Sequence, residues 1–247
     1  MNTQQFFDHL PTITEELSYE DTGTLIDMCD IFSMSNNIST FIIDFAQQGF
    51  LHVSPHPLFL LGYSQQEVMN MGYNFYKEIL LPEDFHKHLQ INKIGFGIFN
   101  TLALEDRKSA HFAYSFYVKH KSGRKILINH KFTPLRFALD GSLWLAICFV
   151  RNSPYKEPGD VVFSTNKGSK HFRYNWDTHK MTEYYLENLT PREQEILHLS
   201  MRGYNEHQIA EELHCRVQTI KNHRQKIIQK MGVHNLSNAI TMFSSVF

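Results

Sequence analysis

The spacing of apolar and polar residues changes twice along the chain. Between Leu25 and Phe32, apolar residues recur at intervals of three and four, which predicts an amphipathic helix. From residue 39 to residue 152, short runs with a period of two predict strands, and helical segments separate these runs. From residue 189 onward the period is again that of helices. We therefore expect two folded domains of different class.

The first expected domain, residues 39–152, has strands at both ends and helices between them. In chain order we expect strands at 41–45 and 50–53, helices at 57–61, from Ser64 and at 82–93, and strands at 111–119, 125–137 and 143–150. This order predicts an α+β domain with one antiparallel five-stranded sheet. Residues 1–38 are expected to form a helical arm that packs on this domain or on a partner. Residues 153–188 are expected to form a linker with a β-hairpin and a third extended piece near 180–185.

The second expected domain, residues 189–247, begins with a strong helix-start signal. Thr190 suits an N-cap, Pro191 the first helical position, and Glu193 the reciprocal position of a capping box. Three further helices are expected, the first beginning after Asn205, the second over 217–231 and the third over 236–243. This part is therefore predicted to be a separate all-α domain of four helices.

Charge is distributed unevenly, although the 247-residue chain has a formal net charge of only −1. No Lys or Arg precedes Lys77, whereas acidic residues crowd the first 30 positions. Residues 214–231, which cover the third helix of the second domain, contain several Lys and Arg and no Asp or Glu. A basic segment in an otherwise neutral chain indicates a local contact with nucleic acid.

Other features of composition exclude several classes of protein. The three cysteines lie far apart and lack metal-ligand spacing, which indicates a reducing compartment with neither a disulfide framework nor a zinc site. The sequence has no signal-peptide pattern and no apolar run near the ~18 residues that cross a bilayer. We therefore expect a cytoplasmic protein with no membrane partner and no bound metal. Phosphate-loop, hydrolase, metalloprotease and kinase motifs are missing, so we do not expect an enzyme.

The predicted helix over 217–231 has one apolar and one polar face. At about 100° per residue its apolar residues fall within one arc, and Gln218, Asn222, Gln225 and Gln229 lie opposite. In the major groove, amide side chains pair with adenine and Lys pairs with guanine, and each good pair discriminates by ~1–3 kcal/mol. This division of faces is typical of a recognition helix, so double-stranded DNA is the expected partner.

The second domain resembles the LuxR-type (GerE) helix-turn-helix family. The resemblance is carried by residues 189–197, Gly203 to Asn205, Ile209 and Ala210, Leu213, Thr219 to Arg224, and Lys230 to Val233. It implies a transcription regulator whose third helix enters the major groove and whose fourth helix forms a dimer contact. Arg216 departs from the Ser or Thr that usually caps the third helix, which weakens the cap and adds a phosphate ligand.

This resemblance also implies particular contacts. The base-reading residues would be Lys221, Asn222 and Gln225, to which the shared polar face adds Gln218. The phosphate-binding residues would be Thr219, Arg216, Arg224, Lys226, Lys230 and Asn205. We expect a homodimer formed through Leu25, Met28, Phe32, Leu236, Ala239, Ile240 and Phe243. RNA polymerase is a further candidate partner of such a regulator.

Residues 39–152 resemble a PAS domain. The resemblance is carried by residues 41–44, Leu60 to Ser64 with Glu67, Pro82 to Asp84, Lys121 to Gly123, and Asp140-Gly141. It implies a sensory or dimerisation domain. Aromatic residues either line a small-molecule pocket there or fill the core; they are Tyr73, Tyr76, Phe96, Phe99, Phe112, Tyr114, Phe116 and Trp144.

No cofactor is predicted for this domain. Flavin-adduct sensors of the PAS family carry a Cys after a Gly-x-Asn step, but here Gly72-Tyr73-Asn74 is followed by Phe75. Haem would need an axial His, for which His86 and His88 on the predicted long helix are the candidates among 15 His residues. The residues do not identify what is sensed.

The leading hypothesis is a one-component regulator, in which a PAS sensor and a LuxR-type domain work as a dimer. A response regulator is one alternative, with phosphorylation at Asp44, but it requires a parallel α/β pattern that the consecutive strands disfavour. A protein-interaction scaffold, in which the PAS-like domain has no ligand, is the other alternative.

Overall fold

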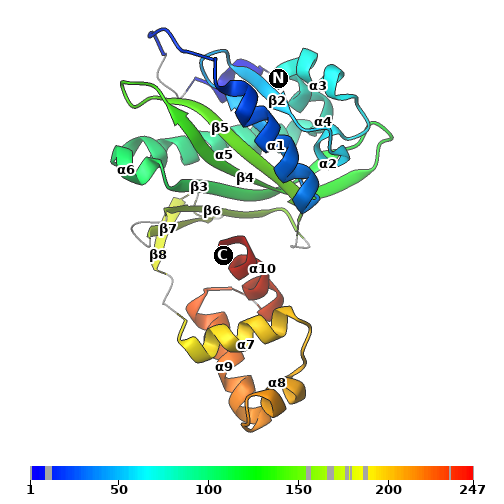
Figure 1. Ribbon diagram of the computed structural model, residues 1–247, viewed down its shortest axis with the longest axis vertical. Coiled ribbons are helices and arrows are strands. Elements are labelled where there is room, and N and C mark those ends of the chain that lie inside the picture. The colour runs from blue at the N-terminus through cyan, green and yellow to red at the C-terminus, as the bar shows by residue number, and fades with distance from the viewer. Residues whose placement is uncertain are drawn as a thin grey trace. The chain divides into compact units, whose positions relative to one another are not determined.

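The computed structural model describes residues 2–8, 13–153, 157–165, 170–175, 178, 180–185, 189–233 and 235–246. The chain divides into two compact units, residues 1–184 and residues 185–247 (Figure 1). The first is an α+β unit. The second is helical, apart from Tyr185, which is the last residue of the final strand. Within the part of the chain described, none of the helices combines the length and apolar character that a membrane span requires.

The first unit is built on one antiparallel sheet. Its strands are β1 (Ser39–Asp44), β2 (Gly49–Val53), β3 (Ala110–Lys119), β4 (Lys125–Phe137), β5 (Leu143–Asn152), β6 (Gly159–Thr165), β7 (Lys170–Asn175) and β8 (Lys180–Tyr185). They lie in the order β2-β1-β5-β4-β3-β6-β7-β8. The predicted order of two strands, helices and three strands is confirmed for β1 to β5. The prediction of a five-stranded sheet is wrong, because the described residues form an eight-stranded one.

The three additional strands come from the segment that we expected to be a linker. β6 pairs with β3, so that Phe163 lies opposite Phe112 and Val162 opposite Ala113, and β7 pairs in turn with β6. Val161 and Phe163 are buried and continue the apolar face of the sheet. Without β6, β3 would be an edge strand with unpaired backbone amide and carbonyl groups. Of the expected hairpin, the turn over 166–168 and residue 176 lie outside the described residues.

Helices separate β2 from β3 and precede β1. They are η1 (Thr3–Phe6), α1 (Thr22–Asn36), α2 (Pro57–Leu60), α3 (Gln65–Met71), η2 (Gly72–Asn74), α4 (Phe75–Ile79), α5 (Pro82–Thr101) and α6 (Leu104–Arg107). α3 begins at the predicted capping box of Ser64 and Glu67. α5 continues eight residues beyond the predicted end at residue 93, because buried residues recur at four-residue intervals to Phe99.

The two faces of the sheet carry different layers. α1 lies across one face, and α2 to α5 lie against the other (Figure 1). The predicted apolar stripe on α1 is divided between two environments. Cys29 is buried and Leu25 packs on the sheet, whereas Met28 and Phe32 are 62% and 44% exposed. Since only part of the stripe faces the sheet, the rest is available at the surface.

One glycine explains why the Gly62-Tyr63-Ser64 step is required before α3. Gly62 has a φ of +90°, a left-handed conformation that favours glycine. A Cβ at this position would also lie 2.8 Å from the ring of His120. The backbone conformation therefore disfavours a side chain at Gly62, and any side chain there would also have to displace the His120 ring.

The second unit consists of α7 (Pro191–Met201), α8 (Glu206–Glu212), α9 (Val217–Lys230) and α10 (Leu236–Val246). The predicted capping box of Thr190 and Glu193 begins α7, and Asn205 caps α8 through the His207 and Gln208 amides. Gly203 follows α7 with a φ of +86°, as expected for a helix end. The core of the unit is formed by Ile196, Leu197, Leu199, Ile209, Ala210, Ile220, Ile227, Met231, Ala239 and Phe243.

Candidate functional site

The helix α9 has a buried face and an exposed polar face. Ile220 and Ile227 are fully buried in the core of the unit. All four predicted base-reading residues are exposed: Gln218, Lys221, Asn222 and Gln225. The Gln218 amide donates to Asn222 Oδ1 at 3.1 Å, so two of these side chains are held in a fixed relation. The polar face therefore presents amides and a cation to the solvent on a rigid support.

The turn before α9 sets the start of this helix. His214 adopts a left-handed conformation with a φ of 49°, and the Cys215 amide donates to the Ala210 carbonyl at 2.9 Å. Arg216 is the N-cap residue, and its side chain makes no capping hydrogen bond. Because Arg216 and Thr219 are both exposed at this end of α9, their side chains are accessible to a phosphate.

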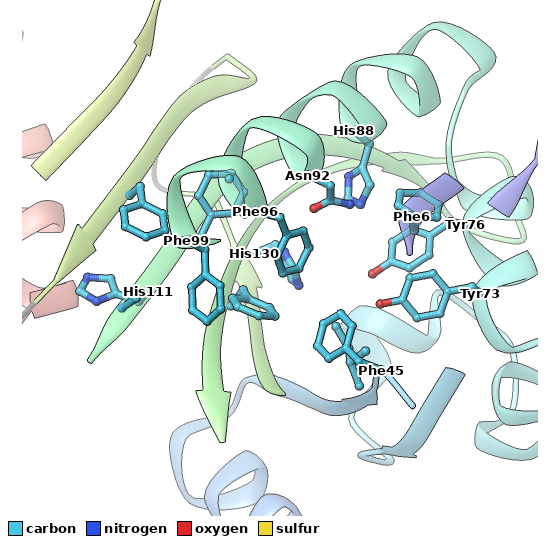
Figure 2. Close-up of a pocket in the computed structure, with 16 residues that line it drawn as sticks. Phe6, Phe45, Tyr73, Tyr76, His88, Asn92, Phe96, Phe99, His111 and His130 are labelled. Atoms are coloured by element: carbon cyan, nitrogen blue, oxygen red, sulfur yellow. The ribbon is translucent and has the colours of Figure 1, made fainter. Parts of the chain in front are cut away.

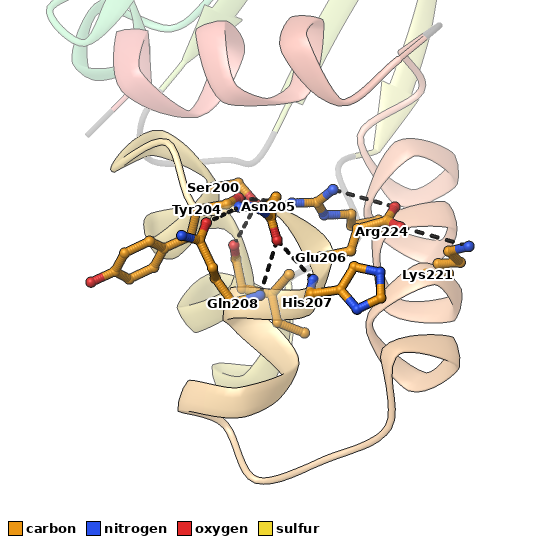
Figure 3. Close-up of polar contacts among 9 residues, drawn as sticks. Ser200, Tyr204, Asn205, Glu206, His207, Gln208, Lys221 and Arg224 are labelled. Atoms are coloured by element: carbon orange, nitrogen blue, oxygen red, sulfur yellow. Dashed lines mark hydrogen bonds and ion pairs between the residues drawn. The ribbon is translucent and has the colours of Figure 1, made fainter.

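Arg224 connects three segments of the unit instead of pointing to the solvent (Figure 3). Its guanidinium donates to the Ser200 hydroxyl at 3.2 Å, to the Tyr204 carbonyl at 3.3 Å and to the Glu206 carboxylate at 3.3 Å. Its side chain is only 16% exposed. Lys221 lies 3.8 Å from the same carboxylate but is 54% exposed. The contacts of Arg224 are those of a structural residue.

The other predicted phosphate-binding residues differ in their freedom. Lys226 is exposed, whereas Lys230 forms an ion pair at 3.0 Å with Glu193, whose side chain is only 3% exposed. The Asn205 side chain is engaged in capping α8. The structure thus leaves Lys226, Thr219 and Arg216 available for phosphate, while Lys230 and Asn205 already have partners within the unit.

The ion pair of Lys230 predicts a pH-dependent contribution to stability. Burial raises the pKa of Glu193. The hydrogen bonds from the Thr190 amide and the Lys230 ammonium lower it by more than burial raises it, so the pKa in the folded protein lies below its ordinary value of 4.5. A carboxyl with a lowered pKa stabilises the fold above pH 4.5, and this contribution is lost as the pH falls through the folded pKa.

We expect Lys230→Ala to lower the free energy of unfolding by about 1–3 kcal/mol at pH 7, because it leaves the Glu193 carboxylate buried without a cation. The difference from the unsubstituted protein should shrink in acid, where Glu193 is protonated. Urea unfolding at pH 7 and at a series of lower pH values, down through the folded pKa of Glu193, measures both effects. Lys226→Ala, which removes an exposed cation four residues earlier, in the preceding turn of α9, is the control and should change neither value appreciably.

The predicted dimer residues fall into two groups. In α10, Ala239 is fully buried, and Phe243 packs edge-to-face on His198 with ring centroids 5.1 Å apart, so both are used within the unit. Leu236 and Ile240 are half-buried. In α1, the exposed apolar side chains are Met28, Ile31, Phe32 and Met34. Among the described side chains of the two helices, those of α1 present the larger exposed apolar surface.

An internal cavity lies between α5 and the sheet in the first unit (Figure 2). It has about 40 Å³ of free space, and its walls are mainly aromatic. The predicted pocket residues that line it are Tyr73, Tyr76, Phe96, Phe99 and Phe112. Phe6 of η1 closes one end by packing against Tyr73, Tyr76, Phe85 and His88. At about 10–15 Å³ per water, this space holds a few waters, so a larger guest would displace aromatic rings.

Three predicted pocket residues lie elsewhere. Tyr114 and Phe116 line a neighbouring hollow between α5 and the start of β6. Trp144 lies on the opposite face of the sheet, packed against Tyr19 with ring centroids 5.2 Å apart. The alternation of side chains along a strand places residues on both faces, and only the fold decides which face carries the cavity.

The polar groups in the cavity wall are the hydroxyls of Tyr73 and Tyr76, one side-chain amide and three histidine rings. His130 is 6% exposed, and neither of its ring nitrogens has a hydrogen-bond partner among the described residues. Burial lowers the pKa of His130 to about 3. Burial, and secondarily His130, lowers the pKa of His88 well below its ordinary value. His88 and His130 are therefore neutral at neutral pH, and His130 is a buried group without a hydrogen-bond partner among the described residues.

The histidines considered for haem have other environments. His88 lies 2.8 Å from the Tyr114 hydroxyl through its Nδ1 and is buried among aromatic rings. His86 is exposed on the outer side of α5. Neither placement offers an imidazole nitrogen directed freely into an open cavity, and we derive no cofactor from them.

Asp44 does not have the environment of a phosphorylation site. It is 1% exposed at the end of β1. Its carboxylate accepts hydrogen bonds from the Tyr19 hydroxyl at 2.7 Å and from the Ala46 and Gln47 amides at 2.9 and 3.0 Å. The antiparallel sheet around it also differs from the parallel sheet that a receiver domain requires.

Two glycines of α5 provide a matched test of the cavity wall. A Cβ at the buried Gly95 would lie 3.1 Å from the Phe112 ring, whereas a Cβ at the exposed Gly97 would meet nothing within 4 Å. We expect Gly97→Ala to raise the free energy of unfolding by about 0.5–1 kcal/mol through helix propensity. In Gly95→Ala this gain should be cancelled or reversed, because the Phe112 ring must shift into the cavity. Equal urea midpoints for the two variants would contradict this description of the wall.

The comparisons with known proteins concern mainly the second unit. Residues 187–243 match the family described as bacterial regulatory proteins, luxR family. The response regulator protein VraR of Staphylococcus aureus is 31% identical over 97 residues, which cover 37% of this chain and 46% of that protein. The chain thus spans about half the length of the curated relatives that it matches.

Two solved structures are similar over larger parts of the chain. The VqmA dimer of Vibrio cholerae, described in the absence of its target DNA, has a TM-score of 0.34 and 14% identity over 91% of this chain and 86% of that one. A PAS domain from Colwellia psychrerythraea has a TM-score of 0.35 and 16% identity over 50% of this chain and 98% of that one.

The second unit is a helix-turn-helix domain, because α8 and α9 are joined by a tight turn and α9 exposes a polar face. Residues 187–243 belong to the luxR family of bacterial regulatory proteins. The first unit has the order of strands and helices that its PAS resemblance implies, extended by three strands.

Proposed function

We propose that this chain is a sequence-specific DNA-binding transcription regulator that acts as a dimer and responds to a small molecule. The observation that carries the DNA-binding part is the exposed polar face of α9 within a luxR-family domain. Gln218, Asn222 and Gln225 follow one another at intervals of four and three residues, so they lie on one side of the helix. In this proposal they and Lys221 read base edges, while Arg216, Thr219 and Lys226 contact phosphates.

The lack of global basicity determines how such a protein would recognise DNA. With a net charge of −1, non-specific attraction must come from the local cations around α9. The affinity should therefore fall with rising salt concentration by an amount set by the small number of phosphates that these cations neutralise. Contacts with the bases must supply the rest of the binding free energy. This combination is that of a regulator rather than of a general DNA-coating protein.

The test is selection of bound duplexes from a random pool, with the full-length protein at two salt concentrations. We expect enrichment of an inverted repeat, since a two-fold dimer presents two recognition helices to two half-sites. Enrichment of a single half-site would contradict the dimer. Weak binding without sequence enrichment at either salt concentration would contradict sequence-specific regulation.

The dimer is proposed to use the uncovered face of α1. Met28, Ile31, Phe32 and Met34 are 44–69% exposed and occupy neighbouring positions on this helix. Phe32 also packs edge-to-face on Phe149 of β5, with ring centroids 5.4 Å apart, so the surface continues onto the sheet. A continuous apolar surface of this kind marks a contact with a partner. The predicted contacts of α10 would then be secondary.

The cavity supports a sensory role for the first unit. Its aromatic walls and its buried, unpartnered His130 suit a small neutral guest with a hydrogen-bonding edge. Native mass spectrometry of the purified protein, together with thermal shift against small heteroaromatic compounds, tests this role. A retained compound or a raised Tm that is lost in Gly95→Ala supports a sensor. Absence of both would favour the alternative of an interaction scaffold without a ligand.

A further inference from the structure

Three metal-ligating side chains lie together between α1 and the edge strand β2, outside the cavity and the DNA-binding unit. Cys29 and Asp30 are consecutive residues of α1, and His52 belongs to β2. One ligand atom from each residue (a thiol sulfur, a carboxylate oxygen and an imidazole nitrogen) lies within 4.8 Å of the other two. Asp30 Oδ1 is 2.7 Å from His52 Nε2. Three kinds of ligand thus converge from two different elements.

We propose that Cys29, Asp30 and His52 bind one divalent metal ion of the zinc type. Zinc binds thiolate, imidazole and carboxylate at about 2.0–2.3 Å in a tetrahedral arrangement, so its ligand atoms lie roughly 3.3–3.8 Å apart. The observed group reaches this spacing if Asp30 and His52 separate slightly and both move toward the sulfur. Three protein ligands leave a fourth position for water, as in open zinc sites.

The surroundings of the cluster fit a bound cation. Cys29 and His52 are buried, whereas the Asp30 side chain is 32% exposed, so the site has a closed inner side and an entrance at Asp30. α1 contains two Asp residues and no Lys or Arg, so no cation on this helix competes for the carboxylate. The Thr40 hydroxyl donates to the Cys29 carbonyl at 3.1 Å and lies 3.0 Å from the Cys29 sulfur, which holds the thiol in place.

Metal binding would change the protonation of two ligands. A coordinating thiol is deprotonated, so the Cys29 proton is released to solvent when the ion binds. The proton shared between His52 Nε2 and Asp30 Oδ1 must also leave that nitrogen, to solvent or to Nδ1, before Nε2 contributes its lone pair; the Asp30 carboxylate contributes another, and no oxidation state changes. The resulting unit of one thiolate, one carboxylate and a divalent cation is neutral, which favours its partial burial.

A bound ion would fasten α1 to the edge of the sheet. Cys29 and Asp30 are held on the helix and His52 on β2, so one ion would add a link between two elements that the Asp30–His52 contact already joins. The same helix exposes Met28 and Phe32 on its outer side. Occupancy of the site would therefore stabilise the position of the proposed dimer surface. This consequence rests on the proposed function, whereas binding of the ion does not.

The test uses the reduced, chelator-treated full-length protein titrated with Co²⁺, a spectroscopic substitute for zinc. We expect a thiolate-to-cobalt charge-transfer band that saturates at one equivalent and disappears when Zn²⁺ is added. Cys29→Ser should remove the band. Cys215→Ser, which alters a half-buried cysteine of the other unit, should retain it. His52→Gln and Asp30→Asn should each weaken binding of the ion at least ~10-fold. Loss of a residue that only hydrogen-bonds to a metal ligand already lowers metal affinity by that much, and these two residues are ligands themselves.

Circular dichroism of each variant establishes that it is folded, and Asp30→Asn provides a nearly isosteric change at the exposed side of the site. The proposal is overturned if the unsubstituted protein shows no charge-transfer band with excess Co²⁺. It is also overturned if Cys29→Ser retains the band or if Cys215→Ser loses it. The readout does not involve DNA, so its failure would leave the DNA-binding proposal unaffected.

Discussion

Arg224→Ala is expected to lower the free energy of unfolding of the DNA-binding unit by about 2–4 kcal/mol. The guanidinium bonds to the Ser200 hydroxyl, the Tyr204 carbonyl and the Glu206 carboxylate, and thereby joins the end of α7, the following loop and the start of α8 to α9 (Figure 3). Alanine removes these bonds together and leaves the Tyr204 carbonyl without this donor. The recognition helix would lose its main polar link to the preceding helices.

Hydrogen exchange in the full-length protein measures this effect where it occurs, because amides of α9 exchange through opening of their own unit. Lys221→Ala is the matched control, since Lys221 contacts the same Glu206 carboxylate at 3.8 Å but is 54% exposed. An exposed ion pair of this kind contributes at most about 0.5–1 kcal/mol. Unchanged exchange of α9 in Arg224→Ala, or equal effects of the two variants, would show that Arg224 is not a structural link.

Elements with local signals could be predicted from the sequence. The start of α7 was predicted from Thr190, Pro191 and Glu193, and the start of α3 from Ser64 and Glu67, because a capping box lies within four residues. The division of α9 into two faces was predicted for the same reason, since its helical period is a property of the segment itself.

Features that depend on distant residues could not be predicted. The strand character of β6 was recognised, but nothing within residues 159–165 indicates that they pair with β3 more than 40 residues earlier. Likewise, the ion pair of Lys230 depends on Glu193, which lies on another helix, and the spacing along α9 gives no sign of it. Trp144 was assigned to the pocket on its residue type, whereas the sheet places it on the opposite face.

The cluster of Cys29, Asp30 and His52 likewise could not be predicted from the sequence. Two of its members are adjacent on a helix, and the third lies on a strand 22 positions after Asp30, so no motif connects them. Reading the spacing of the cysteines alone led to the expectation that no metal is bound. A comparable group becomes visible only when the packing of α1 on β2 is known.

The largest effect on DNA binding is expected from the double variant Asn222→Ala/Gln225→Ala. Both side chains are exposed on the polar face of α9, and each bidentate contact with a base contributes about 1–3 kcal/mol of discrimination. Loss of both should weaken binding to the selected duplex by about 30-fold to 10⁴-fold, given that about 1.4 kcal/mol corresponds to tenfold. Amides carry no charge, so binding to random duplexes and the dependence on salt should stay nearly the same.

Lys226→Ala is the matched control, because Lys226 is also exposed on α9 and follows Gln225 directly. Loss of a single phosphate contact should weaken binding to all duplexes alike and reduce the salt slope by about 0.9. Titrations of the selected duplex and a scrambled duplex, each at several salt concentrations, separate the two patterns. If the double variant also flattened the salt slope, or if Lys226→Ala weakened only the selected duplex, then the division of α9 into base-reading and phosphate-binding residues would be wrong.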